Sequence, residues 1–221
     1  LRDIELKTFN IDLSDTLWFL PKPQGSMAAI LPVHSFGNPV QVTSTLPVLE
    51  DAACALGSPL TYINPSIFSF HATKIITTGE GGMVVTNDAR IENNCRWLRS
   101  QKETPCLAYN YRMTEIQGAI GQEQMKKLPW ILERRKEIAD RYDHAFKDKI
   151  RARIPPQGGN YQSYVLLLNS GIYRSEVIVA LNILGIESLP ATQFLGDMPH
   201  LKTEGLHNAR IAGAAAMRIP M

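Results

Sequence analysis

The chain has 221 residues, which is enough for one large domain or for about one and a half domains of average size. Its hydrophobic fraction of 44% and its charged fraction of 20% are those of a globular protein and exclude a wholly disordered chain. The net charge of +2 favours neither nucleic acid nor an anionic membrane as a partner.

Membrane and metal signals are missing from the sequence. No stretch approaches 18 consecutive apolar residues, so we expect no transmembrane span. Four of the first seven residues are charged, and the segment lacks the apolar run of a signal peptide. Cys54, Cys95 and Cys106 are an odd number without C-x-x-C spacing, which argues against a disulfide framework and against a zinc site. These features predict a cytoplasmic protein without a bound metal.

The first half of the chain alternates short apolar runs with turns. Four apolar segments are candidate strands: residues 28–33, 46–49, 66–70 and 83–86. The first two show no alternation, which predicts strands of a sheet that is covered on both faces. A glycine-rich turn at residues 79–82 introduces the fourth strand, and Asp88 or Asn87 caps a helix after it.

The second half begins with helical character. Thr114 and Gln117 match a T-x-x-Q capping box, and Pro129 suits the first turn of a helix. Apolar residues then recur at helical spacing as far as Phe146, which predicts a long helix that links two domains. After it we expect a loop at 155–159, a strand at 161–168 and an amphipathic helix at 173–184, which Gly185 ends.

The strongest chemical signal is an acid and a lysine at the ends of two predicted strands. Asp51 ends one buried strand, at the position where open α/β sheets present ligand groups, and Lys74 follows the next. Such a pair suits pyridoxal phosphate, because the lysine forms a Schiff base and the carboxylate keeps the pyridine nitrogen protonated. Taken singly, Asp51 is a helix cap and Lys74 an exposed loop residue; their order and surroundings favour the cofactor.

Four segments carry a resemblance to a known family: SFHATKIITTGEGGMVVTND (69–88), PVHSFG (32–37), VLEDAA (48–53) and YNYRMTE (109–115). In this order they resemble the DegT/DnrJ/EryC1/StrS family of sugar aminotransferases, along nearly the whole chain. The resemblance implies an α/β, fold-type I pyridoxal-phosphate transferase with a mostly parallel sheet covered by helices. It implies a large cofactor-binding domain over residues 1–125 and a smaller C-terminal α+β domain over 126–221. It also implies a homodimer with shared active sites.

Site residues are carried over from the same resemblance. Lys74 matches the Schiff-base lysine, Asp51 the partner of the pyridine nitrogen, and Ser69 a serine that reaches the cofactor phosphate. Asn110 matches an asparagine that a neighbouring subunit sends to that phosphate. Without the resemblance, Ser69 is an ordinary strand hydroxyl and Asn110 a turn residue.

The sequence also departs from the family pattern. Cys54 stands where relatives carry Gln or His beside the cofactor ring, and it is a candidate cofactor-binding residue although a thiol is a weak hydrogen-bond donor. The alternative is that Cys54 is a small buried apolar residue. His71 has a packing or a catalytic role, and His34 lines the site or completes a strand end.

Connecting segments are also short relative to the family. The Gly-Thr or Gly-Ser segment that holds the phosphate is expected before Leu1 and is absent from the sequence. Residues 42–45, 55–67 and 99–109 are shorter than the corresponding family segments. We therefore expect that connecting segments have been left out of the sequence; the alternative is a truncated paralogue that cannot hold the cofactor.

The function predicted from these residues is transfer of an amino group, with glutamate as donor, to a nucleotide-linked keto-sugar. A sugar dehydratase of the same fold is disfavoured. In that branch of the family the resemblance implies a histidine at the position that Lys74 occupies here. A non-catalytic binding or regulatory protein is supported by Cys54 and by the absent phosphate segment. A nicotinamide oxidoreductase needs G-x-G-x-x-G after the first strand, and the sequence has none.

Overall fold

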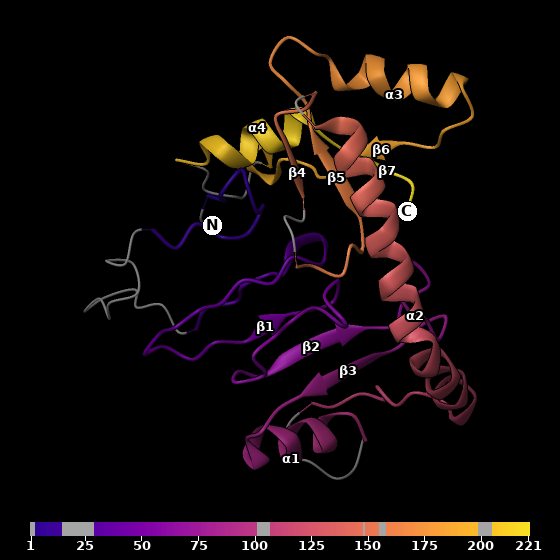
Figure 1. The fold of residues 1–221 in the computed structure, drawn as a ribbon. Helices are drawn as coiled ribbons and strands as arrows, with labels where there is room; N and C mark the ends of the chain where they lie inside the picture. Colours follow the sequence, from indigo (N-terminus) through magenta and orange to yellow (C-terminus); the bar gives the residue numbers. More distant parts are fainter. Residues whose placement is uncertain (1–2, 15–28, 101–106, 148, 155–157, 199–204) are drawn as a thin grey trace.

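The computed structural model describes residues 3–14, 29–100, 107–147, 149–154, 158–198 and 205–221. It contains two β-sheets, and the long helix α2 (Glu115–Phe146) runs from the first sheet to the second (Figure 1). Cys106, residue 28 and most of the predicted loop at 155–159 lie outside the described residues. Within the described part, no helix is both long enough and apolar enough to cross a membrane.

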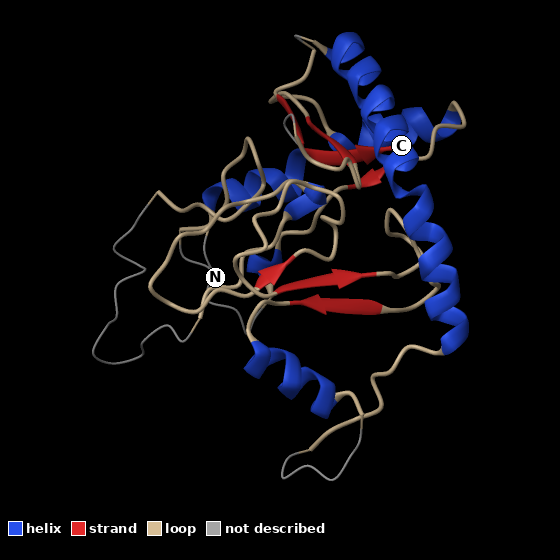
Figure 2. Cartoon of the chain, turned by 60° about the horizontal axis from the view of Figure 1, so that its bottom comes forward, coloured by secondary structure: helices blue, strands red, loops and turns tan. Residues whose placement is uncertain are grey.

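The first sheet has the order β1-β2-β3, with strands Glu50–Asp51, Ser66–Ser69 and Gly82–Val85. Strands β1 and β2 are parallel, whereas β2 and β3 are antiparallel. Two isolated parallel bridges, Ile30 with Val48 and Val33 with Asp51, bring the segment before β1 alongside it. The C-terminal ends of β1 and β2 therefore lie at one edge of this sheet, as the sequence predicts (Figure 2).

Burial along residues 29–34 differs from the sequence prediction. Ile30 and Pro32 are buried, but Leu31 is 57% exposed and Val33 is 46% exposed. The expectation that this strand is covered on both faces is therefore wrong for these residues. The physical reason is that Leu31 and Val33 face a cavity rather than a covering helix.

Helices α1 (Ala89–Leu98) and α2 begin where the sequence predicts. The Arg90 N–H donates to Asp88 Oδ1 at 2.8 Å, which makes Asp88 the N-cap of α1. The same arginine lowers the pKa of Asp88 to about 2, because its side chain and backbone N–H bond the carboxylate. At α2, Thr114 and Gln117 form the complete capping box.

Pro129 lies inside α2 and not in its first turn, so that prediction is wrong. The capping box at Thr114 starts the helix well before it, and a proline removes one backbone hydrogen bond from a helix interior. Packing on both sides compensates. Leu128 is buried with Ile75 and Ile76 beside the first sheet, and Ala139 is buried against the second.

The second sheet is antiparallel throughout and has the order β4-β5-β7-β6. Its strands are Ala152–Ile154, Tyr164–Leu167, Ala216–Ile219 and Leu189–Pro190. One face packs against α2 and α3 (Arg174–Ile183), and the other packs against α4 (His207–Ala215) and the N-terminal segment. All four residues of β5 are buried as a result.

The N-terminal segment is tied to α4 by a carboxylate. Asp3 accepts hydrogen bonds from the backbone N–H groups of Asn208 and Ala209, at 2.9 and 2.8 Å. These N–H groups belong to the first turn of α4, so Asp3 satisfies donors that the helix cannot satisfy itself. The segment is thereby held beside the second sheet, where Phe9 joins the apolar cluster.

Candidate functional site

A cavity of about 890 Å³ lies between the two sheets. Its walls come from the ends of the first sheet, from residues 191–196 after β6, from the N-terminal segment and from α4. Pockets of about 300–1,000 Å³ are typical for small molecules and cofactors. Four residues singled out in the sequence line this cavity: His34, Asp51, Cys54 and Lys74.

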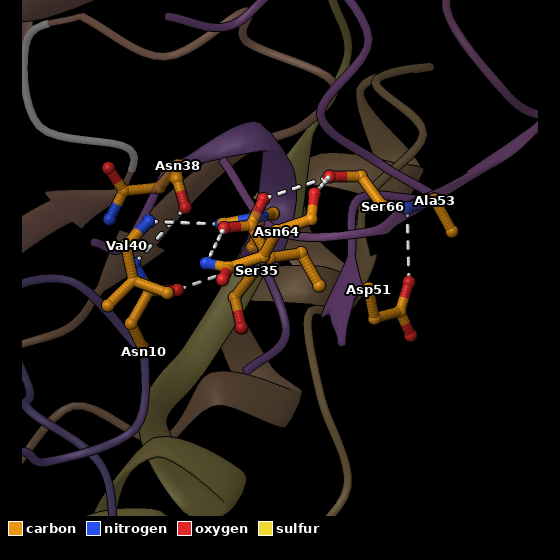
Figure 3. Close-up of polar contacts among 10 residues, drawn as sticks. Asn10, Ser35, Asn38, Val40, Asp51, Ala53, Asn64 and Ser66 are labelled. Atoms are coloured by element: carbon orange, nitrogen blue, oxygen red, sulfur yellow. Dashed lines mark hydrogen bonds and ion pairs between the residues drawn. The ribbon is translucent and has the colours of Figure 1, made fainter. Parts of the chain in front are cut away.

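Asp51 is positioned by the backbone pairing at the end of β1. Its N–H donates to the Pro32 carbonyl at 2.9 Å, and its own carbonyl accepts from the His34 N–H at 3.0 Å. Its carboxylate accepts from the Ala53 N–H at 3.0 Å (Figure 3). The side chain is half-buried, and the turn that it caps leads directly to Cys54.

Lys74 reaches the cavity from a turn that follows β2. Its backbone N–H donates to the His71 carbonyl at 3.0 Å, and its Nζ donates to Cys54 Sγ at 3.1 Å. Cys54 is therefore a half-buried thiol on the cavity wall in contact with the lysine. This placement does not match its alternative role as a small buried apolar residue.

The glycine-rich turn after Lys74 packs against the start of α2. A Cβ atom at Gly81 would lie 2.6 Å from Thr78 Oγ1 and 3.0 Å from Met113 Cε. Gln117 Nε2 donates to the Glu80 carbonyl at 2.9 Å from the same helix start. The turn therefore connects the segment that carries Lys74 to the start of α2. Close packing explains the need for glycine at position 81.

Ser69 and Asn110 do not line the cavity of the single chain, as far as the structure describes its walls. Ser69 ends β2, and its Oγ accepts from the His71 N–H at 3.3 Å. Asn110 is exposed just before α2, and its side chain accepts from Arg112 Nε at 3.1 Å. The structure thus brings Asp51, Cys54 and Lys74 together, but it does not bring Asn110 to them.

His34 has both of the roles that the sequence left open: it lines the cavity and it completes the hydrogen bonds at a strand end. Its ring is 1% exposed and lines the cavity, while Nδ1 accepts from the Val40 N–H at 3.0 Å. Because Nδ1 is an acceptor, the proton of the neutral ring sits on Nε2, which lies 3.4 Å from Glu50 Oε2. Burial lowers the pKa of His34, and the neighbouring Glu50 opposes this shift.

His71, by contrast, is occupied with its own turn. Its Nδ1 lies 2.9 Å from Thr73 Oγ1 and accepts from the Thr73 N–H at 3.2 Å. Its Nε2 faces the exposed Glu80 carboxylate at 3.7 Å. These contacts correspond to the packing alternative, because they shape the turn that carries Lys74.

Glu50 is a buried residue for which the sequence analysis assigned no role. It accepts from Ser66 Oγ and from Asn64 Nδ2, both at 3.0 Å, in addition to facing His34. A buried carboxylate requires such partners, since a buried charge without them is costly. That carboxylate within the run 46–50 is the sequence signal that could have revealed the network.

Asn160 and Gln162 are two further residues that the sequence analysis missed. Asn160 Nδ2 donates to the carbonyls of Cys54 and Leu56, at 2.9 and 2.8 Å. Gln162 Nε2 donates to the Thr73 carbonyl at 2.7 Å. The short segment before β5 therefore bonds the backbone beside Cys54 and the backbone beside Lys74. No local pattern signals these contacts, because the partners lie far apart in the sequence.

Comparisons with known proteins identify the family of the chain. Residues 1–207 match the model of the DegT/DnrJ/EryC1/StrS aminotransferase family. A GDP-perosamine synthase from Caulobacter vibrioides is 33% identical over 253 residues, which cover 100% of this chain and 67% of that protein.

Two solved structures have similar folds. PseC of Helicobacter pylori, an aminotransferase involved in pseudoaminic acid biosynthesis, has a TM-score of 0.88 at 28% identity, covering 100% of this chain and 67% of PseC. A GDP-4-keto-6-deoxymannose-3-dehydratase has a TM-score of 0.86 at 24% identity, covering 99% of this chain and 69% of the dehydratase. The last likeness concerns the fold alone. The expected fold class is confirmed, and the chain spans about two thirds of the length of these relatives.

Proposed function

The chain belongs to the DegT/DnrJ/EryC1/StrS aminotransferase family, and we propose that it converts a nucleotide-linked keto-sugar to an amino-sugar with glutamate as amino donor. The observation that carries this proposal is the presence of Lys74 and Asp51 on the wall of one cavity. The substrate class is supported by the named relatives, one of which is a GDP-perosamine synthase. The absence of a disulfide pattern supports a cytoplasmic site of action.

The side chains of the cavity fit pyridoxal phosphate, the cofactor of the family. Lys74 offers a primary amine for the aldehyde, and Asp51 offers a carboxylate for the protonated ring nitrogen. Cys54 adds a thiol beside the lysine, where it bounds the space that the ring would occupy. When bound, the cofactor supplies an electron sink for the bonds around the carbon that carries the amino group.

The remaining steps are assigned to the residues of this chain. Asp51 holds the charge on the ring nitrogen, because a carboxylate is a strong partner for a cationic N–H group. Lys74 would attach the cofactor, and its amine would act as the general base and acid that moves the proton at the carbon bearing nitrogen. Phe36 and Phe194 give the same cavity apolar walls.

Two alternative functions remain distinguishable from this one. A dehydratase of the same fold is disfavoured by Lys74, because an amine that attaches the cofactor permits transamination. A non-catalytic binding protein requires no lysine and no carboxylate on the cavity wall, yet both line this cavity. The first alternative predicts deoxygenated sugar as product, and the second predicts no turnover at all.

We further propose that the functional unit is a homodimer in which Asn110 serves the cofactor phosphate of the neighbouring subunit, while Ser69 serves its own. Large exposed apolar side chains surround the start of α2, which is typical of a covered surface: Tyr109, Tyr111, Ile116 and Ile120. An amide approaches a phosphate without the desolvation cost of a charged side chain.

We also assign residues 1–125 to a large cofactor domain and 126–221 to a small one.

Mixed dimers test the role of Asn110. A Lys74→Ala subunit lacks the amine, and an Asn110→Asp subunit brings a carboxylate that repels the phosphate. If Asn110 acts across the interface, a mixed dimer has one site with both faults and one intact site. We expect activity to reappear in the mixture although each variant alone is poor. No recovery after confirmed subunit exchange would place Asn110 in its own subunit's site or outside both.

The proposed activity is tested with keto-sugar nucleotides and glutamate, by measuring 2-oxoglutarate release. We expect turnover by the parent chain, and loss of turnover in Lys74→Arg, which keeps the charge but not the reactive amine. Lys126→Arg on the exposed face of α2 is the matched control and should retain activity. Release of 2-oxoglutarate by Lys74→Arg at the parent rate would contradict the proposal.

A further inference from the structure

The contact between Cys54 and Lys74 joins two nucleophilic side chains. Lys74 Nζ lies 3.1 Å from Cys54 Sγ, and both residues line the cavity between the sheets. A small solute that enters the cavity reaches both groups at once. The proposed transamination uses the lysine alone, so the thiol in contact with it has no assigned chemistry.

The backbone on each side of this contact is held by one short segment. Asn160 is buried and donates to the Cys54 and Leu56 carbonyls, while Gln162 donates to the Thr73 carbonyl next to Lys74. Asn160 Oδ1 in turn accepts from the Gln162 N–H at 2.9 Å, which fixes the two amides relative to each other. The thiol and the amine are therefore kept near each other, and such proximity strongly favours reaction between neighbouring groups.

We propose that Cys54 and Lys74 form a reversible sulfur–nitrogen cross-link when a peroxide oxidises the thiol. In the first step Cys54 Sγ attacks an oxygen of hydrogen peroxide: the O–O bond breaks, one oxygen stays on the sulfur, which is oxidised to a sulfenic acid, and the other oxygen leaves as water. In the second step the neutral amine of Lys74 attacks that sulfur. The S–N bond forms, the S–O bond breaks, and a second water leaves with a proton from the amine.

Reduction reverses the link with the same balance. Two molecules of a low-molecular-weight thiol restore the Cys54 thiol and the Lys74 amine, and they become one disulfide. The amine is unavailable while the link persists, so oxidation and cofactor attachment exclude each other. This consequence rests on the proposed function, whereas the link itself requires only the two side chains.

The link is tested in a chain whose other cysteines, Cys95 and Cys106, are replaced by serine. After treatment with hydrogen peroxide and proteolysis, mass spectrometry should find one linked peptide that contains Cys54 and Lys74. Its mass should be two hydrogens below the sum of the two separate peptides, and dithiothreitol should return both. Oxidation of Cys54 to sulfinic or sulfonic acid with the Lys74 peptide unchanged would overturn the proposal.

Three variants sharpen the test. Cys54→Ser should lose the linked peptide, and Lys74→Arg should lose it while dimedone captures the sulfenic acid that persists at Cys54. Equal dimedone capture in the parent and in Lys74→Arg would contradict attack by the lysine. Gln162→Leu should lower the yield of the link without slowing oxidation of Cys54. An unchanged yield in that variant would contradict the role of the segment before β5.

Adding pyridoxal phosphate separates this proposal from the proposed function. If both hold, prior incubation with the cofactor suppresses the linked peptide, because the lysine amine is occupied. If the link forms equally well with and without the cofactor, the link is upheld and the assignment of Lys74 as the attachment site fails. If the cofactor attaches to Lys74 but peroxide never yields a link, the proposed function is upheld and the link fails.

Discussion

The two sheets differ in how their faces are covered. Each face of the second sheet packs into an apolar cluster, and every residue of β5 is buried. The first sheet has two smaller clusters, one around Ala52, Ala55 and Phe68 and one that joins Ile75 and Ile76 to α2, and three of the four residues of β3 are exposed. The catalytic candidates Asp51 and Lys74 stand at the ends of this less covered sheet. Stability and chemistry are therefore assigned to different halves of the molecule.

Truncating the core of the second sheet gives the largest expected effect on stability. Leu167 is 1% exposed inside the cluster that includes Phe9 and Ala216. Leu167→Ala should lower the free energy of unfolding by about 2–5 kcal/mol, because it removes buried methyl groups and leaves a cavity. Urea denaturation measures the change.

The matched control for that truncation is Leu31→Ala on the cavity wall of the first sheet. Leu31 is 57% exposed, so its truncation should change the free energy of unfolding by no more than about 0.5 kcal/mol. A loss at Leu31 equal to that at Leu167 would remove the distinction between the two sheets.

Neutralising Asp51 tests the chemical half of the comparison. Asp51→Asn removes the charge opposite the ring nitrogen but keeps the shape of the turn that Ala53 closes. Turnover should fall about 10²- to 10³-fold, the usual cost of losing one preorganised electrostatic partner, while folding and cofactor binding change little. Asp140→Asn, on the exposed face of α2, should keep full activity. Equal activity in Asp51→Asn and the parent would show that this acid has another role.

The contact between the halves is tested at Asn160. Asn160→Ala removes a buried side chain that donates to the partly buried carbonyls of Cys54 and Leu56. We expect a loss of about 1–3 kcal/mol in the free energy of unfolding, the cost of leaving a buried polar group unpaired. Asn169→Ala, at an exposed position, is the control and should have little effect. Similar stability of the two variants would indicate that the segment before β5 does not hold the two halves together.

The smallest effect concerns pH and His34. Burial lowers the pKa of His34 below its ordinary value of 6.5, so the unfolded chain binds a proton that the folded chain resists. The contribution of this residue to stability is therefore lost as the pH falls below 6.5. His34→Gln should flatten that part of the curve of unfolding free energy against pH. The exposed His144→Gln should leave it unchanged, and a flat curve in the parent would contradict the argument.

Local signals predicted the elements that local contacts build. The caps Asp88 and Thr114 were identified from side chains that bond the next few backbone N–H groups. Asp51 and Lys74 were identified because strand ends at one sheet edge lie close together, which follows from pattern and order alone. Residues 29–34 were misjudged, because an apolar side chain that faces a cavity has the same sequence pattern as one that faces a helix.

Contacts across the chain were beyond the reach of such signals. Asn160 bonds a carbonyl 106 positions earlier, and only the packing of the second sheet against the first brings the two together. Pro129 lies in the interior of α2, where Leu128 and Ala139 pack into two different apolar clusters. The local preference of proline for the first turn of a helix does not take account of such packing. Glu50 is an intermediate case, since a carboxylate in an apolar run signals a partner but does not identify His34.

The central claim is that Lys74 attaches pyridoxal phosphate in the cavity between the sheets. The most direct measurement is reduction of the cofactor-loaded chain with borohydride, followed by proteolysis and mass spectrometry of the labelled peptide. The account predicts a yellow protein before reduction and a single stable label on the peptide that contains Lys74. A label on another lysine, or no label in a preparation that binds the cofactor, would contradict it.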